Sequence, residues 1–268
     1  ICSGPRDGLS TYFHSDAHVV WPHSEKSVIP KATMQKLFDI CDKLYVMYDA
    51  DKTGILNMHE LAFDNIDLKL IYLPDDIRRY MDKRTGKPSK DAEQFFNNYP
   101  AGEGYKHINA RFASMVTTAP TMKFWMEHGG QRKNKDGNKE WIDKFDINIT
   151  NLKCFLNAMG VFTYVDETGA SRFVRVVDNK VDIIKDDEMM THAENLMLSF
   201  ITEHDEYYNE SLANAISTQK KVSMKSLKTL RPVRLNFESW GSDYDWFFFP
   251  NRAVKVTSES IMEYDYSE

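Results

Sequence analysis

The sequence has 268 residues, of which 42% are hydrophobic and 13% aromatic, so it can bury two domain cores and is not a chain that stays disordered. Its formal net charge is −6, which excludes a uniformly basic nucleic-acid binder and leaves only local basic patches for that role. No segment approaches transmembrane length and no signal peptide is visible, so we expect a cytoplasmic protein without a membrane partner.

The cysteines and the first residue add two expectations. Cys2, Cys41 and Cys154 are far apart and form no CxxC pair, which fits a reducing compartment and excludes a zinc ribbon within this sequence. Ile1 falls inside an expected strand and no methionine precedes it, so we expect the sequence to be a fragment of a longer protein.

Residues 1–43 predict two short strands and two helices. A strand ends near Ile1, a tight turn follows, and a helix starts before Leu9. Val19–Trp21 is expected to form a second short strand that ends at Pro22. Between residues 31 and 43 the apolar side chains recur at helical spacing, namely Met34, Leu37, Phe38 and Cys41.

Residues 44–54 carry the strongest chemical signal. The apolar run Leu44–Tyr48 predicts a buried strand, and Asp49, Asp51 and Gly54 follow it directly. Ligands of open α/β sheets bind beyond the carboxyl ends of the strands, and two close carboxylates favour a hard cation, Mg²⁺ or Mn²⁺. The alternative is that both aspartates are loop or helix-capping residues. An EF-hand is disfavoured, because a strand and not a helix precedes Asp49.

Predicted strands and helices continue to alternate up to residue 98. Residues 56–65 predict a helix, residues 68–73 a strand, and Ser89 the N-cap of another helix. Helices that alternate with strands predict an α/β fold with a mostly parallel sheet flanked by helices. The Pro/Gly-rich residues 99–108 predict a linker, which divides the chain into domains 1–98 and 109–268.

Three motifs in this half resemble the toprim domain, the catalytic module of bacterial-type primases and topoisomerases. They are Asp49-x-Asp51-x-x-Gly54, a strand that ends in Leu73-Pro74, and Lys90-Asp91, in the order that the family has. The resemblance covers residues 1–98. It implies that Asp49 and Asp51 are catalytic metal ligands for Mg²⁺ or Mn²⁺, that Asp91 is a third acidic metal ligand or a residue that supports the ligands, and that Lys90 faces phosphate.

One position departs from the family. Gly4 and Asp7 match, but Ser3 stands where the family has a glutamate that is the candidate general acid or base. A serine cannot do that work without a separate base, so either catalysis is lost and metal binding is weak or absent, or another residue substitutes. Glu25, just after the second expected strand, is our candidate substitute; the alternative for it is a solvent-exposed loop glutamate.

Residues 75–88 form a charged excursion that either contacts a nucleic-acid backbone or is a solvated loop. Its basic residues are Arg78, Arg79, Lys83, Arg84 and Lys87. A second basic stretch lies between residues 220 and 234 and is expected either to contact single-stranded DNA or to be an exposed helix face. Its basic residues are Lys220, Lys221, Lys225, Lys228, Arg231 and Arg234.

The second half predicts an α+β, winged-helix-like domain. Residues 109–126 indicate packing, residues 129–139 a flexible loop, and residues 148–160 a helix that Thr150 or Asn148 can cap and Gly160 stops. Strands at 162–169, 172–177 and 180–184, the last two joined by an Asp178-Asn179 turn, precede a helix through Ile201. The aromatic residues 243–249 are expected to pack in a core or a domain interface.

Residues 148–164 and 246–254 resemble, more loosely, the region before the superfamily-3 helicase domain in primase-helicases of phages and mobile elements. No GxxxxGK[ST] motif occurs, so no ATPase is expected in this sequence. Together the resemblances imply a DNA replication protein, the toprim part of a primase-helicase, with a DNA or RNA primer/template and an attached or separate helicase as partners. The alternatives are a non-catalytic toprim scaffold that binds nucleic acid, a toprim nuclease, and an unrelated small-molecule α/β enzyme.

Overall fold

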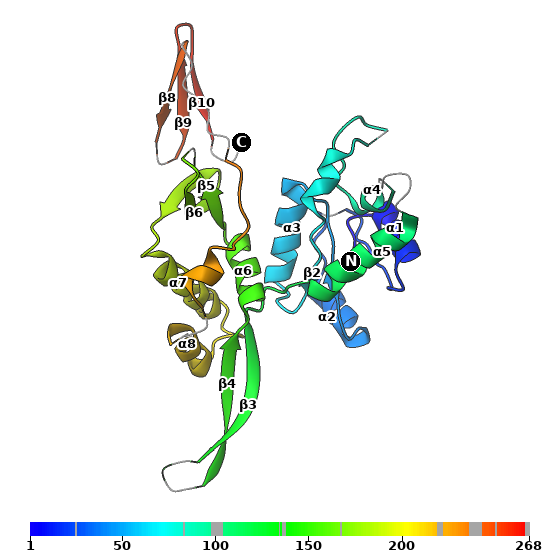
Figure 1. Ribbon diagram of the computed structural model, residues 1–268, viewed down its shortest axis with the longest axis vertical. Helices are drawn as coiled ribbons and strands as arrows, with labels where there is room; N and C mark the ends of the chain where they lie inside the picture. Colours follow the sequence, from blue (N-terminus) through cyan, green and yellow to red (C-terminus); the bar gives the residue numbers. More distant parts are fainter. Residues whose placement is uncertain are drawn as a thin grey trace. The chain divides into compact units, whose positions relative to one another are not determined.

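The computed structural model describes residues 1–24, 26–82, 84–97, 104–133, 135, 138–166, 168–218, 222–235, 243–249 and 251–265. The chain forms two compact units: unit 1 comprises residues 1–124 and 150–155, and unit 2 comprises residues 125–149 and 156–268. Both contain helices and small sheets, so the mixed α/β class is confirmed (Figure 1). Residues 104–124 belong to unit 1, so the first boundary between the units follows residue 124 and not the linker predicted at 99–108.

Parallel strands lie at the centre of unit 1. β1 (Tyr45–Val46) and β2 (Lys69–Leu70) pair in parallel, and Cys2 forms a parallel bridge with Met47. Hydrogen bonds extend both pairings: the Met47 N–H donates to the Ile1 carbonyl at 2.9 Å and the Ile71 N–H to the Val46 carbonyl at 2.9 Å. In the described residues, the predicted mostly parallel sheet is limited to these short segments, and the other three sheets of the chain are antiparallel.

Helices surround these strands. They are α1 (Pro5–His14), α2 (Lys31–Ile40), α3 (Lys52–Phe63), the 3₁₀ helix η1 (Asp75–Arg79), α4 (Ala92–Asn97) and α5 (Gly104–Thr118). The helices predicted at 31–43 and 56–65 are present as α2, which ends earlier at Ile40, and α3, which begins earlier at Lys52. The strand predicted at Val19–Trp21 is wrong: Val20 accepts one hydrogen bond, from the Cys2 N–H, but Trp21 lies against Gly8 and no strand ladder forms.

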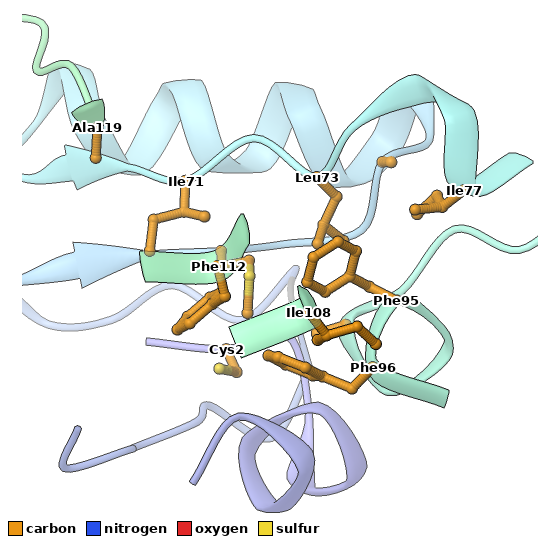
Figure 2. Packing of buried hydrophobic residues seen from close by; sticks show 12 residues of the cluster. Cys2, Ile71, Leu73, Ile77, Phe95, Phe96, Ile108, Phe112 and Ala119 are labelled. Carbon is orange, nitrogen blue, oxygen red and sulfur yellow. The ribbon is translucent and has the colours of Figure 1, made fainter. Parts of the chain in front are cut away.

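A hydrophobic core joins α4 and α5 to the strands. Its buried members are Cys2, Met47, Ala50, Ile71, Leu73, Ile77, Ala92, Phe95, Phe96, Ile108, Phe112 and Ala119. The Phe96 ring centroid lies 5.1 Å from that of Phe95 and 5.3 Å from that of Phe112, in edge-to-face contacts. Figure 2 shows Ile71 and Leu73 pointing toward the side of the strands where these rings lie. This packing fixes the start of α4, and with it the segment that carries Lys90 and Asp91.

Unit 2 begins with a long antiparallel hairpin, β3 (Trp125–Lys133) and β4 (Lys139–Ile147) (Figure 1). The flexible loop predicted at 129–139 is therefore wrong over most of its length. Gly129 faces the Trp141 ring so closely that a Cβ atom there would lie 1.9 Å from Trp141 Cζ2. A glycine pair that suggested a loop instead makes room for a cross-strand tryptophan.

The predicted helix–strand–helix order follows. It consists of α6 (Ile149–Ala158), the antiparallel strands β5 (Val161–Val165), β6 (Ser171–Val177) and β7 (Lys180–Ile184), and α7 (Met189–Glu203). Gly160 ends α6 with a positive φ of 84°, and the Asp178–Asn179 turn has φ values of 50° and 59°. These local predictions are confirmed, because turn residues that tolerate positive φ specify them.

Two short helices and a three-stranded sheet follow in unit 2. They are α8 (Glu210–Ser217), α9 (Met224–Leu227), and the sheet β10–β9–β8 formed by β8 (Tyr244–Phe248), β9 (Ala253–Thr257) and β10 (Ile261–Tyr264). The expected burial of the aromatic residues 243–249 is wrong for Phe247, Phe248 and Phe249, which are half exposed or more. None of the helices in the described ranges combines the length and apolar character that crossing a membrane requires.

Candidate functional site

The site begins where β1 turns into α3. The Asp51 side chain caps α3, because its Oδ1 accepts the Gly54 N–H at 2.9 Å. A Cβ atom at position 54 would lie 2.4 Å from the Asp49 carbonyl oxygen, so glycine is required there. The turn thus presents two carboxylates within three residues. Asp51 is thus a helix-capping residue, which was the alternative to a metal ligand. Its second carboxylate oxygen, Oδ2, remains available to another partner.

That partner is Lys90. Its Nζ lies 2.9 Å from Asp49 Oδ2 and 2.5 Å from Asp51 Oδ2, so one ammonium joins both carboxylates. The backbone fixes the approach, because the Ala50 N–H donates to the Lys90 carbonyl at 2.7 Å. Two segments about forty residues apart in sequence are therefore joined by both backbone and side chain.

Ser3 contacts the same carboxylates. Its Oγ lies 2.7 Å from Asp7 Oδ2 and 3.0 Å from Asp49 Oδ1, and its single proton serves one of them at a time. Asp7 is buried, and its Oδ1 accepts the Glu93 N–H at 3.0 Å at the start of α4. The position where the family has a glutamate therefore lies beside Asp49, but it holds a neutral hydroxyl.

Asp91 lies at the N-terminus of α4. Its Oδ1 accepts the Gln94 N–H at 2.8 Å, and Gln94 Oε1 accepts the N–H groups of Lys90 at 2.7 Å and Asp91 at 3.3 Å. This reciprocal arrangement is a capping box, so the N-cap predicted at Ser89 is wrong. Ser89 is fully buried, and α4 starts two residues later than expected.

Burial and neighbouring charges shift the pKa values of the three aspartates in different directions. Burial is the largest cause that raises the pKa of Asp91, to about 6, and the negative charges of Asp7 and Asp49 add to it. Burial likewise raises the pKa of Asp49, although Lys90 opposes the shift. For Asp51 burial is outweighed by the Gly54 N–H and by Lys90, and its pKa is lowered. The pKa of Lys90 is raised, because its bonds to Asp51 and Asp49 outweigh its burial. Lys90 and Asp51 are therefore charged at neutral pH.

A pocket of about 760 Å³ adjoins these residues, a size typical of small-molecule sites. Its lining includes the cations Arg6, Arg78, Arg84, Lys87 and Lys90 and the acids Asp51, Asp82 and Asp91.

The described residues of the 75–88 excursion contain η1 and a tight turn, and several of them line this pocket. Asp82 accepts the Arg84 N–H at 2.9 Å and the Thr85 hydroxyl at 3.0 Å, and Gly86 closes the turn with a φ of 65°. Arg84 pairs with Asp82 and Glu93, and Arg78 donates to the Ala50 carbonyl.

Sequence reasoning missed Arg6 and Asp82 as parts of this site. The Asp-x-Arg-Thr-Gly pattern at 82–86 is a turn signal from which the role of Asp82 could have been predicted. No local pattern indicated that Arg6 would line the pocket.

The other predicted residues are distributed as follows. Arg79 is exposed and is not among the residues that line the pocket. Lys225 and Lys228 belong to unit 2; Lys225 is exposed, and Lys228 Nζ lies 3.6 Å from Asp186 Oδ2. Glu25, Lys83, Lys220 and Lys221 lie outside the described residues.

The donor set fits a magnesium-like ion. No group of three or more histidine, cysteine or acidic side chains in the described ranges is arranged to hold a metal. Mg²⁺ needs fewer protein ligands, because it commonly binds through one or two carboxylates and completes its shell with water and substrate phosphates. Asp49 Oδ2 and Asp51 Oδ2 already converge on a cation, the Lys90 ammonium.

Comparisons with known proteins give no match. No family model matches the sequence, and no curated protein or solved structure matches it significantly.

Proposed function

We propose that unit 1 is a toprim-like module that performs metal-dependent nucleotidyl transfer, as the toprim part of a primase-helicase in phage or mobile-element DNA replication. The observation that supports it is the meeting of Ser3, Asp49, Asp51 and Lys90, from three distant parts of the sequence, at the ends of parallel strands beside a cation-lined pocket. Acidic and basic groups in this arrangement suit phosphoryl chemistry, in which charge must be neutralised and oxygens positioned.

The chain's own residues have distinct roles in this proposal. Asp49 and Asp51 would hold Mg²⁺ or Mn²⁺, which when bound neutralises phosphate charge and lowers the pKa of an attacking hydroxyl. Arg6 and Lys87, both exposed on the pocket lining, would bind the nucleotide's phosphates. The template would be DNA, the helicase either attached or separate, and the location cytoplasmic.

A non-catalytic scaffold is the second candidate, and two observations favour it. Ser3 contacts Asp49 where a proton-transferring carboxyl is expected, and a serine without a base does not transfer protons effectively. Lys90 also neutralises part of the charge of both aspartates without a metal. Under this alternative the module binds nucleic acid, and substitution of Asp49 leaves the affinity unchanged.

The test is primer synthesis by the 268-residue chain on single-stranded DNA with ribonucleotides and Mg²⁺ or Mn²⁺. Asp49→Asn and Asp51→Asn should each lower the rate by about 100-fold or more, because each removes a charged metal ligand. Asp67→Asn is the matched control, since Asp67 is an exposed carboxylate of unit 1 paired with Lys123.

Three outcomes separate the candidates. Synthesis that Asp49→Asn does not affect refutes the proposal. Template cleavage in place of synthesis identifies the nuclease alternative. DNA binding without either activity identifies the scaffold.

A further inference from the structure

We propose that the Lys90 ammonium is a built-in competitor of the divalent cation: it occupies the convergence point of Asp49 and Asp51 until a phosphate in the adjacent pocket draws it away. Metal and phosphate would then bind cooperatively. This inference rests on the metal site of the proposed function.

The hydrogen bonds of the two carboxylates define the competition. Asp49 Oδ1 faces the Ser3 hydroxyl at 3.0 Å and Asp51 Oδ1 accepts the Gly54 N–H at 2.9 Å, so these two oxygens hold the site together. The other oxygen of each carboxylate contacts Lys90 Nζ, at 2.9 Å and 2.5 Å. A metal ion held by Asp49 and Asp51 would compete with the ammonium for these carboxylates and would be repelled by its charge.

Lys90 is built so that only its side chain moves. Its carbonyl accepts the Ala50 N–H at 2.7 Å and its N–H donates to Gln94 Oε1 at 2.7 Å, so the backbone is fixed on both sides. The side chain is 44% exposed and lines the pocket together with Asp51. A lysine ammonium stands on a flexible stem of four carbons, so it can leave a carboxylate and contact a phosphate without movement of the backbone.

The surroundings favour that exchange when an anion is present. Arg6 and Lys87 line the same pocket and are exposed, and in the described residues no ion pair joins either of them to Asp49 or Asp51. A tetrahedral anion beside them offers Lys90 a second site of negative charge. Once Lys90 turns to the anion, the two aspartates regain their full attraction for a divalent cation. By linkage, the anion then tightens metal binding and the metal tightens anion binding by the same factor.

The experiment measures Mn²⁺ affinity of the 268-residue chain by electron paramagnetic resonance of free Mn²⁺, without nucleotide and at constant ionic strength. Lys90→Met keeps the length of the side chain and removes its charge, so it should bind Mn²⁺ about tenfold more tightly than the wild type. Lys90→Arg keeps a charge and should not gain affinity. Lys36→Met is the matched control, because Lys36 is an exposed lysine of α2 in unit 1 and does not line the pocket.

The second measurement adds sulfate, a tetrahedral dianion that binds free Mn²⁺ only weakly. Sulfate should tighten Mn²⁺ binding to the wild type by about threefold or more and should have no effect on Lys90→Met, because the coupling passes through Lys90. Lys90→Gln is a second uncharged variant, and thermal unfolding shows that each variant is folded.

Several results overturn the inference. Mn²⁺ affinity that is equal or weaker in both Lys90→Met and Lys90→Gln means that Lys90 does not compete with the metal. Equal effects of sulfate on wild type and Lys90→Met mean that the lysine does not couple the two ligands. Because no turnover is measured, an inactive chain with tighter Mn²⁺ binding in Lys90→Met supports this inference and counts only against the proposed nucleotidyl transfer.

Discussion

Replacement of Asp91 by asparagine is expected to stabilise unit 1 at neutral pH and to lose that effect in acid. The pKa of Asp91 is raised by burial, and by Asp7 and Asp49, from 3.8 to about 6. The folded state therefore holds this proton more tightly than the unfolded chain, and stability decreases as the pH rises from about 4 to about 6. Asparagine has no charge to bury, and its side-chain oxygen can still accept the Gln94 N–H that caps α4.

The size of the effect follows from the pKa. The difference between 3.8 and about 6 corresponds to at most about 3 kcal/mol at pH 7.5. Asp91 lines an open pocket, and water there screens its charge, so we expect about 1 to 2 kcal/mol. Asp91→Asn should exceed the wild type by this amount at pH 7.5 and equal it below pH 4. Asp91→Ala also removes the cap and should lose about 1 kcal/mol relative to Asp91→Asn at every pH.

The buried thiols provide an assay that reports on unit 1. Cys2 and Cys154 are free, buried and within unit 1, so they react with a thiol reagent when unit 1 unfolds. Labelling as a function of urea, in a Cys41→Ser background and with a dipyridyl disulfide, whose protonated rings keep it reactive toward thiols in acid, gives the free energy of unfolding at each pH. A stability difference between Asp91→Asn and wild type that stays constant from pH 4 to pH 7.5 refutes the electrostatic argument.

Two further predictions use the same assay. Phe96→Ala leaves a cavity in the aromatic core and should lower the free energy of unfolding by about 3 to 5 kcal/mol. Phe13→Ala is the control, because the Phe13 side chain is 78% exposed, and it should lower that free energy by less than about 0.5 kcal/mol. Similar losses at both positions would contradict the core assignment. Gly54→Ala should destabilise unit 1 and weaken Mn²⁺ binding, because its Cβ would lie 2.4 Å from the Asp49 carbonyl oxygen. Gly4→Ala is the tolerated control in the same unit, because its backbone is extended and its Cβ would meet only Asp7 Oδ2, at 4.0 Å. Unchanged Mn²⁺ binding in Gly54→Ala would show that this turn does not position the carboxylates.

The comparison of sequence and structure is clearest at the turns. Asp51 and Gly54 specify the start of α3, and Asp178, Asn179 and Gly160 specify turns in unit 2 that the sequence predicted. Each of these features depends on residues within a few positions of one another. Gly160, Asp178 and Asn179 adopt positive φ, and Gly54 leaves space for the Asp49 carbonyl. The glycines at 129 and 130 suggested a loop, but Gly129 lies in a strand. The Trp141 ring, which occupies the space beside Gly129, comes from the opposite strand.

The sequence by itself determined that an Asp-x-Asp pair follows a buried strand and turns into a capped helix, because neighbouring residues encode strand, turn and cap. Only the tertiary structure decided that Lys90 joins Asp49 and Asp51, that Ser3 contacts Asp49, and that residues of the 75–88 excursion line a pocket beside them. Those contacts arise when the core rings of α4 and α5 pack against the strands and bring the start of α4 to the end of β1. Packing between distant segments minimises exposed apolar surface over the whole unit, and no local pattern of residues records where it will place a particular side chain.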